Sequence, residues 1–241
     1  MISIFLKEIN EFLNSLIAYV VIGVFLIGIG VIMWVFPDTN VLDYGYASME
    51  PLFSLGPYVF MFLIPAITMK SFAEEKRSGT MELLQTLPFT NAQIILGKFF
   101  AGFFLVLFSV LPTIIYYFSL NKLGNPPGNL DTPGIIGSYI GLILLGGVFT
   151  SIGILSSALT GNQIVSFILA AFLSFLFYAG FDAIAGINIW SEWSYVIGEL
   201  GIMAHYASIS RGLVDLKDVI YFISLVSLML LITQLIIGWR K

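Results

Sequence analysis

The chain has 241 residues, of which 59% are hydrophobic and 10% charged, and its mean hydropathy is +0.99. A soluble domain is about 45–50% apolar, so this composition excludes a soluble globular protein and indicates an integral membrane protein. The net charge of −4 gives no reason to expect a nucleic-acid partner, and the absence of cysteine excludes disulfides and thiolate chemistry.

The N-terminal segment, residues 1–15, predicts an amphipathic helix. Apolar residues recur at helical spacing, while charged and amide side chains such as Lys7, Glu8 and Glu11 fall on the other side. Such a helix suits the cytoplasmic interface of a membrane. The alternative is a cytoplasmic extension of the first membrane helix.

Six apolar runs follow, and each is long enough for a membrane-spanning helix. Crossing the ~30 Å hydrocarbon core takes about 20 residues as a helix, because lipid offers no partner for unpaired backbone groups. The predicted spans are residues 16–36, 52–69, 99–120, 134–159, 165–181 and 219–239. The expected fold is an all-α integral membrane protein that forms one transmembrane domain over residues 1–241. The fourth span is rich in Gly and Ser, which predicts close packing within the chain.

The distribution of basic residues predicts the orientation of the chain. With both termini on one side, that side holds seven of the ten Lys and Arg residues, which are Lys7, Lys70, Lys76, Arg77, Lys98, Arg240 and Lys241. The opposite segments, 37–51, 121–133 and 182–218, carry most of the acids. Since cytoplasmic loops are enriched in Lys and Arg, both termini are expected in the cytoplasm.

A polar island, residues 70–98, separates the second and third predicted spans. Within it, Gly79 and Thr80 can open a short cytoplasmic helix over residues 80–87, with Thr80 as N-cap and Pro88 near its end. Leu83, Leu84 and Leu87 are expected to form one apolar face of this helix. A simple solvated loop is the alternative, but an exposed apolar patch usually marks a binding site.

The sequence contains no residues that would let the chain drive transport by itself. The six predicted spans contain no ionisable residue, which disfavours a self-contained proton-coupled carrier. The chain has no GxxxxGK[ST] phosphate loop for ATP hydrolysis. His205 is the only histidine, and the chain has no cysteine, so a metal site or a Ser/His/Asp catalytic triad is not expected. We therefore expect no enzyme activity. If the protein does work, the power comes from another polypeptide.

The run SFAEEKRSGTMELL at residues 71–84, followed by Leu87 and Pro88, resembles the segment after the second span in permease subunits of type-2 ATP-binding-cassette (ABC) exporters. That resemblance implies a coupling helix that docks in a groove of a separate ATP-binding subunit. It also implies that ATP is bound by that subunit, that this chain needs no cofactor, and that a second permease pairs with it in the lipid as a homodimer or heterodimer. The candidate partner-binding residues are Glu74, Glu75, Arg77, Gly79, Thr80, Glu82, Leu83, Leu84, Leu87 and Pro88.

A second run, HYASISRGLVDLKDV at residues 205–219, looks like the gliding-motility-associated branch of these permeases and like a related nitrous-oxide-reductase-maturation permease. This resemblance implies short outer helices over residues 183–212 that dip partly into the membrane, and a role in bacterial gliding motility or associated secretion. His205 and Arg211 are expected to hold this outer segment to the last helix. The competing class is a membrane anchor or channel component that is not coupled to nucleotide hydrolysis.

Overall fold

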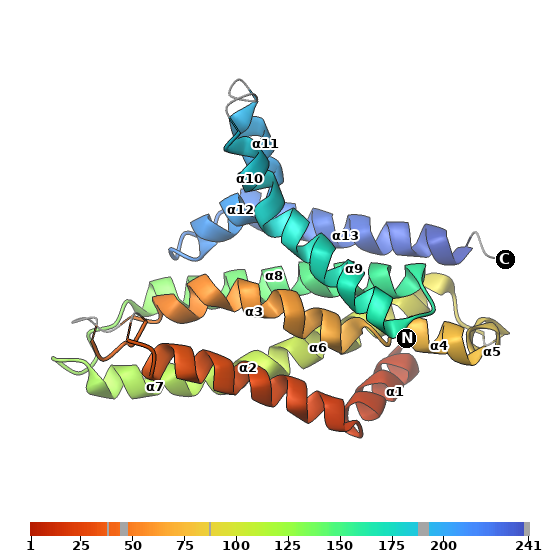
Figure 1. The fold of residues 1–241 in the computed structure, drawn as a ribbon, viewed down its shortest axis with the longest axis horizontal. Coiled ribbons are helices and arrows are strands. Elements are labelled where there is room, and N and C mark those ends of the chain that lie inside the picture. The colour runs from red at the N-terminus through yellow and green to blue at the C-terminus, as the bar shows by residue number, and fades with distance from the viewer. Residues whose placement is uncertain (38, 44–47, 87, 188–192, 239–241) are drawn as a thin grey trace.

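The computed structural model describes residues 1–37, 39–43, 48–86, 88–187 and 193–238, and every regular element in these ranges is a helix (Figure 1). The long helices are α2 (Leu16–Trp34), α3 (Glu50–Thr68), α6 (Asn91–Val110), α8 (Thr132–Leu159), α9 (Gln163–Phe175) and α13 (Leu216–Gly238). The short helices are α1 (Ile2–Leu13), α4 (Ala73–Ser78), α5 (Met81–Thr86), α11 (Ser194–Leu200) and α12 (Ile202–Ile209). Two of the long helices are extended. The turn η1 (Leu111–Thr113) joins α6 to α7 (Ile114–Leu123), and the π-helical turn η2 (Leu176–Gly180) joins α9 to α10 (Phe181–Ala185).

A helix lies over each of the six predicted spans. Five helical segments of the described chain are long and apolar enough to cross a membrane, and α1 with α2 forms a sixth candidate if that bent pair is one span. Because α1 meets α2 at 71°, only α2 runs along the bundle. The N-terminus and the last turns of α13 lie at the end of the bundle that also holds α4 and α5 (Figure 1).

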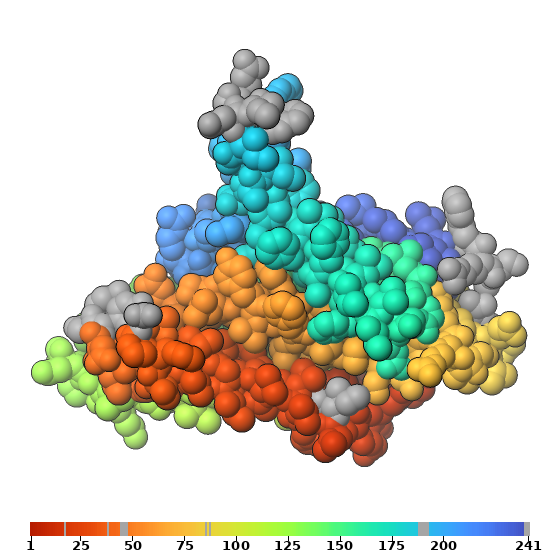
Figure 2. Space-filling view, viewed as in Figure 1, coloured from red at the N-terminus to blue at the C-terminus, as the bar shows by residue number. Residues whose placement is uncertain are grey.

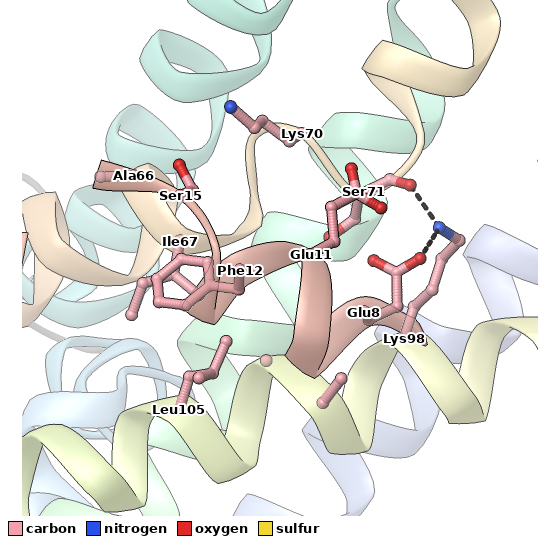
Figure 3. Close-up of a pocket in the computed structure, with 12 residues that line it drawn as sticks. Glu8, Glu11, Phe12, Ser15, Ala66, Ile67, Lys70, Ser71, Lys98 and Leu105 are labelled. Carbon is pink, nitrogen blue, oxygen red and sulfur yellow. Dashed lines mark hydrogen bonds and ion pairs between the residues drawn. The ribbon is translucent and has the colours of Figure 1, made fainter. Parts of the chain in front are cut away.

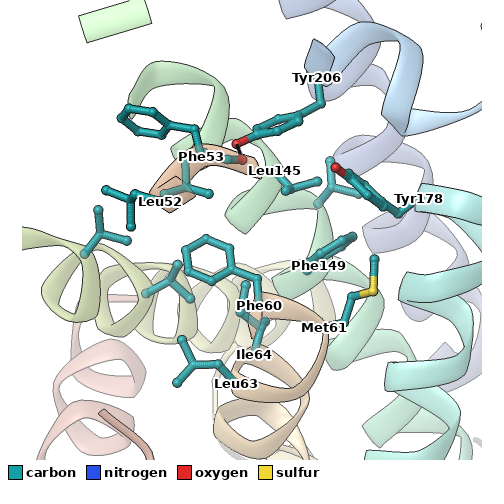
Figure 4. Packing of buried hydrophobic residues seen from close by; sticks show 14 of the residues in the cluster. Leu52, Phe53, Phe60, Met61, Leu63, Ile64, Leu145, Phe149, Tyr178 and Tyr206 are labelled. Atoms are coloured by element: carbon teal, nitrogen blue, oxygen red, sulfur yellow. Dashed lines mark hydrogen bonds between the residues drawn. The ribbon is translucent and has the colours of Figure 1, made fainter. Parts of the chain in front are cut away.

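Helix α8 forms the centre of the bundle. In its most apolar stretch 83% of the residues are buried, against 22% in both α9 and α13. Phe149 and Leu145 of α8 pack with Phe60 and Ile64 of α3 (Figure 4). The small residues of α8 permit this closeness, since a Cβ at Gly153 would stand 2.7 Å from the Cβ of Thr68. The prediction of close packing within the chain is therefore confirmed.

Helix boundaries differ from the predicted spans where polar caps extend the helices. Thr90 caps α6 in a reciprocal capping box with Gln93, so α6 begins at Asn91, two turns before the predicted span at residue 99. Asp131 accepts a hydrogen bond from Gly134 N–H and starts α8 at Thr132. Helix α6 therefore begins inside the polar island, residues 70–98, and not at its end.

The segment before α13 contains short helices, as the resemblance implied for residues 183–212, and their position on the outer side of a membrane stays a prediction. α10 and α11 pack against each other and project from the bundle (Figure 2). The chain breaks at Gly201 and continues as α12, which returns to pack on α8 and α13. Their partial entry into the membrane stays a prediction.

Candidate functional site

The first turn of helix α4, at the start of the polar island, is bonded to a hydroxyl group of α8. The backbone N–H groups of Phe72 and Ala73 donate to Ser157 Oγ at 2.9 and 3.0 Å, and the Ser157 hydroxyl donates to the Met69 carbonyl at 3.1 Å. The first amides of a helix have no partner inside it, and Phe72 offers no side-chain cap. Ser157 therefore acts as a cap that comes from a distant part of the chain.

The junction between α4 and α5 is a sharp turn at Gly79. Gly79 has φ +72°, the left-handed conformation that ends many helices, and it stands as the C-cap of α4. The Thr80 carbonyl accepts from Leu84 N–H at 3.1 Å, so a helix does start where the sequence predicted it. The Thr80 hydroxyl does not act as the predicted side-chain cap of this helix, because it turns back toward Ser78 Oγ, 2.9 Å away.

The apolar residues of α5 do not form one free face. Leu84 and Met81 pack against a buried cluster of the same chain that includes Ile94 and Ile237. Leu83 points the other way and is 66% exposed. The reason is helical geometry, since residues three apart share a face and adjacent residues do not. Leu87, which was predicted to join Leu83 and Leu84, lies outside the described residues.

A buried ion cluster joins α1, α4 and α6. Lys98 Nζ lies 2.6 Å from Glu8 Oε1, 3.0 Å from Glu75 Oε1 and 2.6 Å from the Ser71 carbonyl (Figure 3). Lys7 Nζ reaches the same Glu75 oxygen at 3.0 Å. Only 1% of the Lys98 side chain is exposed. We call Lys7, Glu8, Glu75 and Lys98 the Lys98 cluster; its two cations and two carboxylates balance in charge.

Burial and pairing oppose each other in the Lys98 cluster. Burial raises the pKa of Glu8, although Lys98 pulls it down. Burial is the largest single influence on the pKa of Lys7 and lowers it, but the hydrogen bond to Glu75 and the nearby charges of Glu75, Glu8 and Glu11 together leave that pKa raised. The ammonium of Lys98 also lies 5.0 Å from the centre of the Phe72 ring. Three segments far apart in the sequence are thus held by one buried ammonium group.

Close packing holds α1 on α6 beside these charges. A Cβ at Gly97 would lie 3.0 Å from the Ile4 side chain, so glycine permits the contact between the helices. Ile4 and Ile9 are buried, whereas Ile2 and Leu6 stay exposed. An amphipathic helix is present as predicted, but its polar side is divided, because Glu8 turns into the protein.

The candidate partner-binding residues fall into two groups. The exposed ones are Arg77, Gly79, Thr80, Glu82, Leu83 and Pro88. Glu75 is buried in the Lys98 cluster, and Glu74 and Leu84 are partly buried. Glu75 and Leu84 each contact their own chain, and the docking of any of these residues on a partner stays a prediction.

Sequence reasoning missed Lys98, which it took as a loop cation. The sequence does contain a pattern that indicates burial of Lys98: it directly follows the apolar residues Ile94 and Ile95 and Gly97, at the beginning of a helix. An acid must then approach it from elsewhere, because a buried charge without a partner is costly. Spacing could not identify Glu8, which is 90 residues away.

His205 has the structural role that the sequence predicted. Its Nδ1 lies 2.6 Å from Asp218 Oδ1 of α13, its Nε2 lies 2.9 Å from the Glu199 carbonyl, and its ring stacks on Tyr221. Both ring nitrogens are engaged, which leaves neither free as a base or ligand. Arg211 instead donates to the Ala207 carbonyl of its own segment, so it does not join that segment to α13. No group of three potential metal ligands occurs in the described part of the chain.

Comparison with known proteins finds a family and a relative that are similar to this chain. Residues 2–237 match the family described as "ABC-2 family transporter protein". A Bacillus subtilis (strain 168) protein, "Probable ABC transporter permease YtrC", is 30% identical over 123 residues, which are 48% of this chain and 37% of that protein. The chain thus aligns with little more than a third of this relative's length.

Proposed function

The chain belongs to the ABC-2 transporter family, and we propose that it is the membrane permease subunit of an ABC exporter, driven by a separate ATP-binding subunit that docks on α4 and α5. The exposed residues Arg77, Gly79, Thr80, Glu82, Leu83 and Pro88 form the docking surface. We call them the coupling surface. The exposed Leu83 at its centre is the observation that carries this proposal.

Leu83 has the properties of an interface anchor. It is a large apolar side chain with 66% of its surface free, next to the charged Glu82. Burying a leucine completely contributes about 1.5–3 kcal/mol, which can centre a small interface ringed by polar groups. Met81 and Leu84 hold α5 against the bundle from the other side, so Leu83 is presented on a fixed support.

The Lys98 cluster and Ser157 supply the path by which docking becomes motion. Ser157 fixes the start of α4 to α8, while Glu75 fixes its middle to α6 through Lys98. Glu8 adds α1 to the same ammonium group. A push on α5 therefore displaces α1, α4 and the first turns of α6 together. ATP-driven closure of the partner subunits would in this way tilt the adjoining long helices between inward-facing and outward-facing states.

The charge distribution supports the orientation of the proposed subunit. The basic residues Lys7, Lys70, Lys76, Arg77 and Lys98 all belong to the end that holds α4 and α5. The rule that basic residues stay inside supports a cytoplasmic position for this end and for both termini, and the family resemblance supports a bacterial inner membrane. The exposed sides of α9 and α13 leave room for a second permease, identical or related. The run over residues 205–219 supports a link to gliding motility or associated secretion.

Charge placed on the coupling surface tests the proposal. We expect Leu83→Asp to insert normally but to lose co-purification with the ATP-binding subunit, and to lose its stimulation of ATP hydrolysis, because it puts a carboxylate into an apolar contact. Leu213→Asp is the matched control, since Leu213 is 64% exposed at the other end of the bundle. If Leu83→Asp binds and stimulates the ATP-binding subunit as the wild type does, the chain is an anchor or channel component without nucleotide coupling.

A further inference from the structure

A cavity of about 560 Å³ lies between α3, α8, η2 and α12, away from α4 and α5. Its size suits a small ligand, since ligand pockets hold about 300–1,000 Å³. The charged residues that line it, Glu50, Asp131 and Arg211, are exposed and form its mouth. Tyr58, eight residues after Glu50 on α3, lies about 12 Å further along that helix. The cavity is therefore charged at the mouth and aromatic toward its floor.

Tyr178 borders this cavity with an unused hydroxyl group. The residue is 3% exposed, and its hydroxyl forms no hydrogen bond with any residue that the structure describes. Its neighbour Tyr206, by contrast, donates to the Phe53 carbonyl at 2.6 Å (Figure 4). The Tyr178 hydroxyl is not among the fully buried polar atoms without a partner, so it keeps access to the cavity, where a ligand can meet it. Tyr178 stands in the π-helical turn η2, and π turns are frequent at functional sites.

The charges at the mouth favour a cation. Two carboxylates and one guanidinium group line the cavity, and Arg211 Nε is already bonded to the Ala207 carbonyl. Asp131 Oδ1 accepts from Gly134 N–H, while the Glu50 carboxylate bonds to no described residue. Aromatic rings also attract cations and apolar groups. The ring of Tyr178 lies 5.7 Å from that of Tyr58 and 6.1 Å from that of Tyr206, which gives a continuous aromatic floor.

We propose that this cavity binds an amphiphile that carries a protonated amine. The amine lies at Glu50 and Asp131, the apolar body follows the tyrosine rings, and a polar atom of the body, such as an ester carbonyl, accepts from the Tyr178 hydroxyl. An ethanolamine lipid head group and a free long-chain amine both provide this chemistry. A role of this ligand as the transported substrate rests on the proposed transport function. The binding of the ligand in the cavity does not rest on that function.

Binding to the purified full-length chain in maltoside micelles tests this inference. The probe is radiolabelled lysophosphatidylethanolamine, and lysophosphatidylglycerol is its matched analogue without the amine. We expect the analogue to bind at least about tenfold more weakly, and Tyr178→Phe and Glu50→Gln each to weaken the probe about three- to tenfold. Two controls outside the cavity, Tyr19→Phe and Asp215→Asn, should leave its Kd unchanged.

Competition by dodecylamine distinguishes the two possible ligands, a free long-chain amine and an ethanolamine lipid. Displacement of the probe would support a free amine as ligand, and failure to displace it would support an ethanolamine lipid. Equal affinity for both lysolipids, or a wild-type Kd in both Tyr178→Phe and Glu50→Gln, would overturn the inference. The ATP-binding subunit is absent from this assay, and Leu83→Asp should bind the probe normally, so this result is independent of the coupling proposal.

Discussion

Replacing Lys98 with methionine removes the cation that two buried carboxylates share. Glu8 and Glu75 would remain in place with side chains 15% and 10% exposed, and the Ser71 carbonyl would lose its donor. Methionine keeps most of the apolar length of the lysine side chain, so the change isolates the charge. We expect Lys98→Met to destabilise the protein strongly and to loosen α1 and α4 from α6.

The magnitude follows from the burial of the two acids. Removing one partner of a buried ion pair costs about 3–5 kcal/mol, because the remaining charge stays desolvated. For a chain of this size 1 kcal/mol shifts Tm by about 2–4 °C, so the expected loss is about 6–20 °C. Replacing Glu8 and Glu75 with glutamine in the same protein should recover more than half of it, since the two carboxylates that Lys7 alone cannot neutralise then disappear.

Acid should also relieve the defect of Lys98→Met. Burial already raises the pKa of Glu8 above its usual 4.5, and loss of Lys98 removes the group that opposes this rise. An acid with a raised folded-state pKa binds its proton more tightly when folded, so stability falls as pH rises from the unfolded value through the folded one. The Tm gap between Lys98→Met and wild type should therefore be smaller at about pH 5 than at about pH 8.

Thermal unfolding in maltoside micelles, followed by circular dichroism, measures these shifts. Lys217→Met is the matched control, because Lys217 pairs with Glu199 at 2.6 Å but its side chain is 65% exposed. An exposed pair contributes little, so the Tm of this control should hardly move. Equal Tm values for Lys98→Met and Lys217→Met would refute the argument that the Lys98 cluster holds the three helices together.

Three further predictions concern the packing of α1, the cap of α4 and the orientation of the chain. Gly97→Val should push α1 off α6 and lower Tm, whereas Gly23→Ala should not, because a Cβ at Gly23 meets nothing within 4 Å; thermal unfolding compares the two. Ser157→Ala should cost about 0.5–2 kcal/mol in thermal unfolding, since two amides of α4 lose their acceptor, and a wild-type Tm would show that water replaces it. In this cysteine-free chain, Asn125→Cys should react with an impermeant thiol reagent added outside intact cells and Ser78→Cys should not; the reverse pattern would invert the topology.

The sequence predicted the long helices well because their signal is local. A run of about 20 apolar residues must form a helix in lipid, whatever its neighbours are. The start of α6 was missed because the capping box of Thr90 and Gln93 precedes the apolar run by several residues. The extent of α9 through η2 to Ala185 was also missed, since nothing in the composition there marks where the helix ends.

The candidate site was only partly predictable, because tertiary contacts decide which of its side chains are buried and which are exposed. The position of a helix after Gly79 and Thr80 follows from local residues. The opposite directions of Leu83 and Leu84 depend on where α5 lies against Ile94 and Ile237. The burial of Lys98 depends on α1 crossing α6, a contact between residues about 90 positions apart. The cap from Ser157, 84 residues from Ala73, was hidden for the same reason.

Photocross-linking from the coupling surface tests the central claim most directly. A benzophenone amino acid at position 83, in the chain co-expressed with its genomic neighbours, should form a covalent adduct with an ATP-binding subunit. The same amino acid at position 213 provides the control, because Leu83 and Leu213 are similarly exposed at 66% and 64%. The account predicts an adduct at position 83 and none at position 213. An ATP-binding subunit that cross-links at neither position, while it co-purifies with the chain, would contradict it.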